Sequence, residues 1–172
     1  IINKFNKITT KTEPTVGANS VTCIVPFYDR DITLNVWDTA GQENFQCLVP
    51  MFARCAQVAV IVFDVTSDSS YENISFWFKH IKENSQVPNI IICANKIDLI
   101  TDVNMERINK LKDLYNCPVY ITSAVSGINI ETMFIAIAEI VDRSDLIENS
   151  VVIPRVDFQN PVDDTNHQGG CC

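Results

Sequence analysis

Two neighbouring segments near the start of the chain alternate apolar and polar residues. This period of two predicts half-buried strands over residues 21–27 and 32–36, and the polar residues 28–31 between them predict a hairpin turn. Pro26 has no N–H to donate to a ladder, so we expect the first strand at a sheet edge. The residues that share a face are Val21, Cys23, Val25 and Phe27 in the first strand and Ile32, Leu34 and Val36 in the second.

Three later segments are continuously apolar instead. Residues 58–63 and 90–94 are typical of strands buried on both faces of a parallel sheet, and residues 117–121 form a shorter third run. Apolar residues at helical spacing follow each run, and Ser69 with Glu72 predicts a capping box at the start of the first helix. The helical positions are Tyr71, Ile74, Phe78 and Ile81, then Ile108, Leu111 and Tyr115, and then Ile130, Met133, Phe134, Ile137, Ala138 and Val141.

Strands therefore alternate with helices along most of the chain. This order predicts an α/β fold with an open, mostly parallel sheet and an antiparallel edge hairpin. The helical pattern ends near Val141, and the residues after it are polar with scattered proline and glycine. We therefore expect one domain over residues 1–142 and a flexible tail over residues 143–172.

The composition narrows the classes of function. With 172 residues, of which 47% are hydrophobic, the chain is large enough for one domain with a sizeable core. Its 13 basic and 21 acidic residues give a net charge of −8, which argues against nucleic-acid binding because nucleic acids are polyanions. The seven cysteines include no C-x-x-C pair, so we expect the five scattered ones to be reduced core thiols and expect no zinc site. The apolar runs are too short to cross a bilayer.

The loops after the predicted strands hold the candidate chemistry, because ligands of such sheets bind beyond the carboxyl ends of the strands. After the second strand, Asp38 could hold a hydrated divalent cation. Gly41 could offer its N–H to a phosphate oxygen, and Gln42 could orient a water. Taken alone, this segment is also compatible with an ordinary turn.

Two further loops follow apolar runs. At the end of the run 90–94, Asp98 could accept two N–H groups from a planar base edge while the stem of Lys96 lies along the face of the base. At the end of the run 117–121, Ser123 and Ala124 could supply a backbone N–H to a carbonyl of the same base. A solvated loop is the alternative at either place.

Taken together, the three segments resemble the small GTPases, whose D-x-x-G-Q, N-K-x-D and S-A elements contact phosphate, the guanine base and the guanine carbonyl. Residues 13–17 lie where that family has its first switch with a magnesium-binding threonine. The resemblance covers residues 1–142 and implies a P-loop NTPase-like, Ras-type three-layer sandwich. Residues 37–43 and the closing cysteine pair are similar to the Rab branch, which governs vesicle traffic. Residues 15–18 and 50–52 are similar to its early-endosomal members.

The resemblance implies a role for each site residue. Gln42 would be catalytic and would position the attacking water, while Gly41 would contact the γ-phosphate. Thr15 would ligate Mg²⁺ and contact the γ-phosphate, and Asp38 would bind the same ion through a water. The implied guanine-binding residues are Asn95, Lys96, Asp98, Ser123 and Ala124.

The same resemblance implies a GTP hydrolase that acts as a molecular switch in membrane traffic, with GTP or GDP as ligand and Mg²⁺ as cofactor. The implied partners are a guanine-nucleotide exchange factor, a GTPase-activating protein, effectors, and escort or GDI-type proteins that handle prenylated GTPases. We expect a monomer on the cytoplasmic face of endomembranes, endosomes included, that cycles with the cytosol. The implied effector surface comprises Val16, Gly17, Trp37 and Phe52.

The tail predicts a lipid anchor. Cys171 and Cys172 follow a polar segment that offers them no packing role, and the Rab resemblance implies that both are geranylgeranylated. Residues 142–172 hold two basic and six acidic residues, a charge of −4, so an anionic membrane surface repels them. Since one lipid chain binds membranes only marginally, we expect the second lipid rather than a basic patch to complete the anchor.

The chain departs from the family at the phosphate-binding loop. No G-x-x-x-x-G-K-[ST] motif occurs in the 172 residues, although this loop neutralises phosphate charge and binds Mg²⁺ in the family. There, a first strand and the loop precede the helix that residues 1–5 resemble, and that strand lies between the strands at 32–37 and 58–63. We therefore expect these 172 residues to be a fragment of a complete GTPase. The first strand and the P-loop of that GTPase are missing from the fragment.

Two other functions remain open at this point. A truncated, nucleotide-weak interaction module would keep the effector surface and the lipid anchor, and the upstream coding sequence distinguishes it from a GTPase. A flavodoxin-like domain for another cofactor would share the α/β pattern. It leaves the segment 95–98 unexplained.

Overall fold

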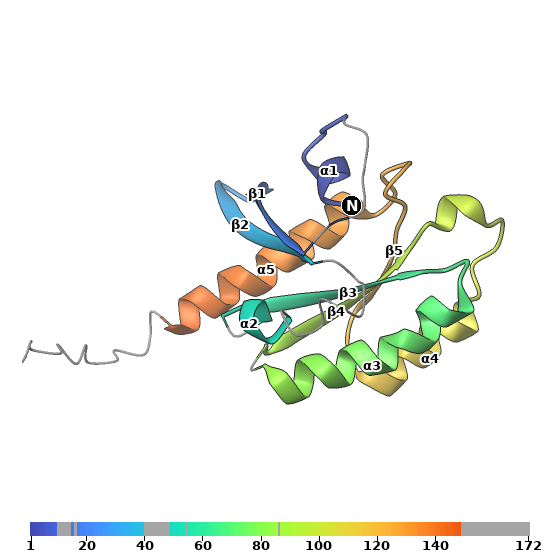
Figure 1. Cartoon of the computed structure of the whole chain (residues 1–172). Helices are drawn as coiled ribbons and strands as arrows, with labels where there is room; N and C mark the ends of the chain where they lie inside the picture. Colours follow the sequence, from blue (N-terminus) through green and yellow to red (C-terminus); the bar gives the residue numbers. More distant parts are fainter. Residues whose placement is uncertain (10–14, 16, 40–48, 54, 86, 149–172) are drawn as a thin grey trace, which may run out of the picture.

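Figure 1 shows a computed structural model of the chain, which describes residues 1–9, 15, 17–39, 49–53, 55–85 and 87–148. Strands β1 (Ala18–Phe27) and β2 (Arg30–Thr39) form an antiparallel hairpin in which Phe27 pairs with Arg30 across the turn. Within the described residues β1 pairs with β2 alone, so the expected edge position of Pro26 is confirmed. Alternate residues of β1 are buried, as the period of two predicts.

Strands β3 (Val58–Asp64), β4 (Asn89–Asn95) and β5 (Val119–Ile121) form a second, parallel sheet in the order β3-β4-β5. The apolar run of β4 is buried on both faces, as predicted. For β3 the prediction is wrong in part, because Val62 is 50% exposed. In the described chain β3 is an edge strand with β4 as its single neighbour, and the layer on that face leaves Val62 uncovered.

The helices follow the predicted alternation with the strands. The long ones bury the apolar positions that the sequence pattern predicts, such as Ile108 and Leu111. Their bounds are α1 (Ile2–Phe5), α2 (Val49–Ala53), α3 (Asp68–Asn84), a 3-10 turn η2 (Ile97–Leu99), α4 (Met105–Tyr115) and α5 (Ile130–Glu148). Helix α5 runs through Glu148, so regular structure continues beyond the domain boundary expected after residue 142.

The start of α3 differs from the predicted capping box. Ser67, not Ser69, is the N-cap, because Ser67 has extended backbone angles and its side chain accepts the N–H of Ser70 at 3.2 Å. Ser69 lies within the first turn, where its hydroxyl contacts that of Ser67 at 3.0 Å. The serine-rich sequence predicts a cap here but leaves its register open among three serines.

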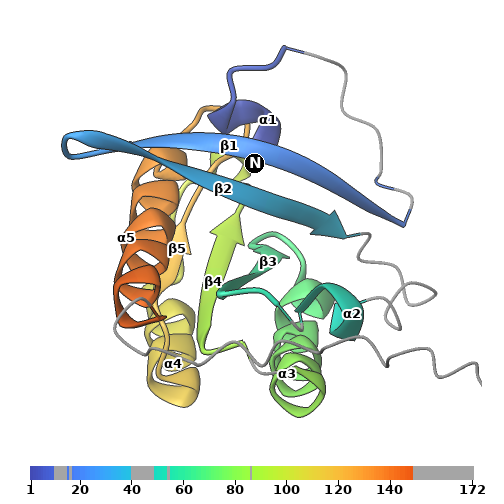
Figure 2. The same ribbon diagram turned by 90° about the vertical axis from the view of Figure 1, so that its left-hand side faces the viewer.

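Two apolar cores lie on opposite faces of the parallel sheet. One core joins β3 and β4 to α3 and α4, and the other joins β4 to α5 and the β1–β2 hairpin. Strand β4 serves both, since Ile92 and Ala94 point to the first core and Cys93 points to the second. Figure 2 shows α3 and α4 below the strands of the parallel sheet, the hairpin above them and α5 along one side. The predicted α/β, Ras-type sandwich is confirmed.

The cysteines only partly match the expectation of core thiols. Cys23 and Cys93 are buried and Cys117 is half-buried, but Cys55 is exposed in the segment before β3. Cys47 lies outside the described residues. None of the described helices is both long and apolar enough to cross a bilayer.

Candidate functional site

The carboxyl ends of β4 and β5 bring together the two loops that the sequence predicts to bind a base. Asn95 ends β4, and its Oδ1 accepts the N–H of Ala124 at 3.0 Å and the hydroxyl of Thr122 at 3.3 Å. Because both donors hold the oxygen, the NH₂ group of the Asn95 amide is the end available to a ligand. The N–H of Ala124 therefore donates to Asn95 in this structure, whereas the sequence interpretation assigned that N–H to a base carbonyl.

A buried pair lies behind Asn95. The thiol Sγ of Cys93 is 3.1 Å from Oγ1 of Thr122, and both residues are fully buried. Since Thr122 donates its proton to Asn95, it accepts from the thiol of Cys93. Burial raises the pKa of Cys93, which keeps the S–H donor in place, although the contact with Thr122 acts in the opposite direction. The orientation of Asn95 thus depends on a chain of three side chains.

Asp98 is the predicted acceptor of the base edge. It lies in η2, and its Oδ1 accepts the hydroxyl of the buried Ser123. The backbone N–H of Ser126 donates in turn to the Ser123 hydroxyl at 3.0 Å, so that serine is oriented from both sides. An ionised carboxylate has about four acceptor sites, so Asp98 keeps capacity for the two N–H groups of a base edge.

The loop that holds these residues is closed by backbone bonds. Lys96 adopts a left-handed conformation, with φ of 70°, which turns the chain sharply from β4 into η2. The N–H of Ile97 donates to the carbonyl of Thr122 at 3.3 Å, and the N–H of Thr122 donates to Ala94 at 2.7 Å. The two loops are therefore hydrogen-bonded to each other before any ligand is present.

Asp64 is a site residue that the sequence reading missed. It ends β3, and its Oδ2 lies 2.8 Å from the ammonium Nζ of Lys96, while its Oδ1 accepts both the N–H and the hydroxyl of Thr66. Burial alone raises the pKa of Asp64, but these contacts with Lys96 and Thr66 outweigh it and lower the net pKa. The signal was present, because Asp64 directly follows the apolar run 58–63 at a strand end.

The two predicted magnesium-binding side chains also meet. The hydroxyl of Thr15 donates to Oδ2 of Asp38, near the end of β2, at 2.8 Å. A hydroxyl and a carboxylate are the hard oxygen ligands that Mg²⁺ prefers, so the pair fits that ion. The phosphate-facing and catalytic residues of the sequence interpretation, Gly41 and Gln42, lie outside the described residues.

The predicted effector surface is described in part. The rings of Trp37 and Phe52 stack with centroids 4.6 Å apart, and Trp37 is 50% exposed. Gly17 has a φ of 77°, a conformation that favours glycine, and Val16 lies outside the described residues. The predicted lipidation sites, Cys171 and Cys172, lie outside them too.

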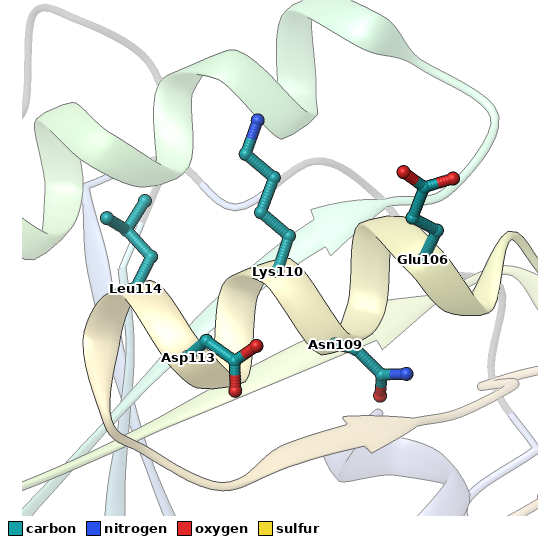
Figure 3. Close-up of a pocket in the computed structure, with 5 residues that line it drawn as sticks. All are labelled: Glu106, Asn109, Lys110, Asp113 and Leu114. Atoms are coloured by element: carbon teal, nitrogen blue, oxygen red, sulfur yellow. The ribbon is translucent and has the colours of Figure 1, made fainter.

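A pocket elsewhere in the molecule holds none of the predicted site residues. It lies along one face of α4, as Figure 3 shows, and the strand ends do not contribute to it. Its lining residues are Glu106, Asn109, Lys110, Asp113 and Leu114. The candidate site is therefore the cluster of polar side chains at the strand ends.

Comparison with known proteins gives consistent similarities. The sequence model of the Ras family matches residues 1–143. The chain is 34% identical to Ras-related protein Rab-32D of Dictyostelium discoideum, over 82% of this chain and 66% of that protein. It is 36% identical to putative Ras-related protein Rab-5B of the same organism, over 80% and 64%. It is 37% identical to human Ras-related protein Rab-22A, over 77% and 70%. The chain thus spans slightly less than two thirds of the first two of these relatives.

Proposed function

The chain belongs to the Ras family, within its Rab branch, and on that premise we propose that it binds and hydrolyses GTP as a molecular switch in intracellular vesicle traffic. The observation that supports this most is the preformed polar cluster at the ends of β4 and β5. Its donors and acceptors are fixed by buried neighbours and match those of a guanine edge. A match of this kind rejects other bases, because a mismatched base leaves polar groups unpaired.

Guanine recognition divides among three side chains in this proposal. Asp98 accepts the two N–H groups of the guanine edge, and the amide NH₂ of Asn95 donates to an acceptor of the base. The apolar stem of Lys96 lies along the face of the ring. Ser123 and Ala124 hold the loop in shape, Ser123 through Asp98 and Ala124 through Asn95.

The phosphate end of the nucleotide would be bound with Mg²⁺. Thr15 and Asp38 would hold the ion, Thr15 by its hydroxyl and Asp38 through a water, and the ion would neutralise charge on the phosphate oxygens. Gly41 would contact the γ-phosphate with its N–H. Because the 172 residues contain no G-x-x-x-x-G-K-[ST], hydrolysis is conditional on a phosphate loop supplied upstream of residue 1.

Gln42 is proposed to position the attacking water. A glutamine amide is no strong base, so its contribution is orientation of the water in line with the γ-phosphorus. In a form of the protein with a phosphate loop, Gln42→Leu should leave GTP affinity within a few-fold. Single-turnover hydrolysis should fall at least about tenfold, which is about 1.4 kcal/mol of transition-state stabilisation. Equal single-turnover rates for mutant and wild type would remove Gln42 from the mechanism.

Partners and membrane attachment complete the proposed switch. GTP would order the segments around Thr15 and Gln42 for effectors, and hydrolysis would release them. The stacked pair Trp37 and Phe52 would form part of the effector surface together with Val16 and Gly17. Exchange factors, GTPase-activating proteins and GDI-type proteins would control the cycle. Lipids on the two cysteines at 171 and 172 would hold the protein on the cytoplasmic face of endomembranes.

Nucleotide titration tests the binding step directly. Amide spectra of the chain recorded with increasing GDP and Mg²⁺ should show shifts at residues 95–98 and 122–124, and ADP should shift the same amides only at much higher concentration. This method detects weak, millimolar binding, so it suits these 172 residues, which contain no G-x-x-x-x-G-K-[ST] motif. Absence of GDP-dependent shifts would contradict nucleotide binding by this chain.

A further inference from the structure

We propose that Asp64 is a positioning residue for guanine recognition: it holds the ammonium group of Lys96 so that the lysine stem is in place before the base arrives. This inference rests on the proposed function, because it concerns how the guanine site is prepared. The side chain of Asp64 is paired with Lys96, so Asp64 would act through that lysine.

The carboxylate of Asp64 is itself fixed in orientation. Oδ1 accepts the N–H of Thr66 at 2.9 Å and its hydroxyl at 2.7 Å, which leaves Oδ2 to face Lys96 at 2.8 Å. The backbone N–H of Asp64 donates to the hydroxyl of Ser70 at 3.0 Å. Three separate contacts therefore set the position of the oxygen that receives the lysine.

The strand ends that hold the two charged residues are joined as well. Asp64 pairs with Asn95 in the register of β3 and β4, and the N–H of Val65 donates to the carbonyl of Asn95 at 3.0 Å. Lys96 follows directly in a left-handed conformation that only a few non-glycine residues adopt. The backbone of Lys96 and its ammonium group are thus held by the same pair of strands.

Lysine needs such a partner for this purpose. Its four-carbon stem has several rotatable bonds, and a ligand that orders a free lysine loses affinity because the side chain gives up conformational entropy. Lys96 is half exposed, so packing alone does not hold it. An ion pair to a fixed carboxylate orders the stem before the ligand binds, which is preorganisation.

A purely structural role for the same ion pair would predict that its loss lowers the free energy of unfolding and leaves nucleotide affinity unchanged. Ion pairs at this degree of exposure contribute little to folding stability, so the free energy of unfolding should hardly depend on the pair. If the charge of Asp64 acted only by general repulsion of an anionic nucleotide, its removal should strengthen binding. The positioning role predicts weaker binding on removal of the same charge.

The test uses the Asp64→Asn and Lys96→Met variants, singly and together, with Asp68→Asn as the matched control. Asn keeps an oxygen acceptor for Thr66, and Met keeps an apolar stem without the ammonium group. Asp68→Asn removes the same charge four residues away, where the carboxylate pairs with Arg107 at 2.7 Å instead of with Lys96. Dissociation constants for GDP with Mg²⁺ come from amide shifts, and thermal unfolding of each variant checks the fold.

We expect Asp64→Asn to weaken GDP binding about three- to tenfold, with a thermal midpoint close to that of the wild type. In the Lys96→Met background the same change should alter the affinity by less than about twofold, and so should Asp68→Asn in the wild type. Unchanged or tighter GDP binding by Asp64→Asn would overturn the inference. It would also be overturned if Asp64→Asn weakened GDP binding as much in the Lys96→Met background as in the wild type. If the wild-type chain shows no GDP-dependent shifts at all, the proposed function fails first and the inference with it.

Discussion

The hydroxyl of Thr122 shows how one buried group sets the chemistry of the site. It accepts from the thiol of Cys93 and donates to Asn95, so it fixes which end of the Asn95 amide a ligand meets. Neither Thr122 nor Cys93 would touch the base in the proposed mode of binding. Their contribution is to remove an alternative orientation of Asn95.

Replacement of Thr122 by valine tests this role. The change keeps the shape of the side chain but leaves the Cys93 thiol without its acceptor and Asn95 with one donor fewer. We expect the free energy of unfolding to fall by about 1 to 2 kcal/mol and GDP affinity to fall several-fold, because buried polar groups lose partners. Denaturant unfolding and GDP titration measure the two effects. Thr122→Ser keeps the hydroxyl and should stay close to wild type; if valine does as well as serine in both measurements, the hydrogen-bond chain has no such role.

At this scale the sequence predicts the residues that would meet a base better than those that hold them. Asn95, Lys96 and Asp98 are recognisable because their spacing at a strand end follows a known pattern. The partners Asp64 and Thr122 come from other strand ends, and their side chains meet the site only because of the strand register. Periodicity predicts the strands but not their register, so these two contacts could not be derived from it.

The turn between β1 and β2 holds a residue with a Cβ in the left-handed conformation. Tyr28 begins the β1–β2 turn with a φ of 54° and a side chain that is 94% exposed. A left-handed conformation costs a residue with a Cβ about 1 to 2 kcal/mol, and glycine avoids this cost. Replacement of Tyr28 also removes the edge contact between its ring and that of Phe27, whose centroids lie 4.7 Å apart.

We therefore predict that Tyr28→Gly raises the free energy of unfolding by about 0.5 to 1 kcal/mol, since relief of the strain exceeds the loss of an exposed ring contact. Tyr28→Ala is the control, because alanine removes the ring and keeps the Cβ. Chemical denaturation of the three proteins measures the difference. Equal stability of the glycine and alanine variants would show that the turn is not strained.

The elements themselves were predicted well wherever one period dominated. The two-residue period of β1 and the helical periods of α4 and α5 each match the buried residues found. The failures have local causes. The cap of α3 lies at Ser67 because several serines compete for it, and Val62 is exposed because the described residues leave its face of β3 uncovered. A continuous apolar run indicates a strand but does not say how many neighbours it has.

At the scale of the whole molecule, the hairpin and the parallel sheet form separate ladders in the described residues. They meet instead through a shared apolar core, in which Val25 of β1 and Leu34 of β2 are buried with Cys93 of β4. The ion pair between Arg30 and Asp142 also joins the hairpin to α5. The sequence interpretation placed a further strand of the family between β2 and β3. That strand stays a prediction.

Membrane attachment is a prediction for the whole protein. Because residues 142–172 have a charge of −4, lipids on the cysteines and not electrostatics should hold it on membranes. Replacement of both Cys171 and Cys172 by serine should release the protein to the cytosol, while raised salt should leave the wild type bound. Cell fractionation measures both. Wild-type protein that salt alone strips from vesicles would contradict the lipid anchor.

Base selectivity tests the central claim most directly. Competition of GTP, XTP and ATP for the nucleotide site should show a wild-type preference for GTP over ATP of at least about a hundredfold, because a mismatched base leaves buried polar groups unpaired. Asp98→Asn exchanges one acceptor for a donor, so the preference should move to XTP, whose base has a carbonyl where guanine has its amino group. A wild type that does not distinguish GTP from ATP, or an Asp98→Asn variant that still prefers GTP to XTP, would contradict the account.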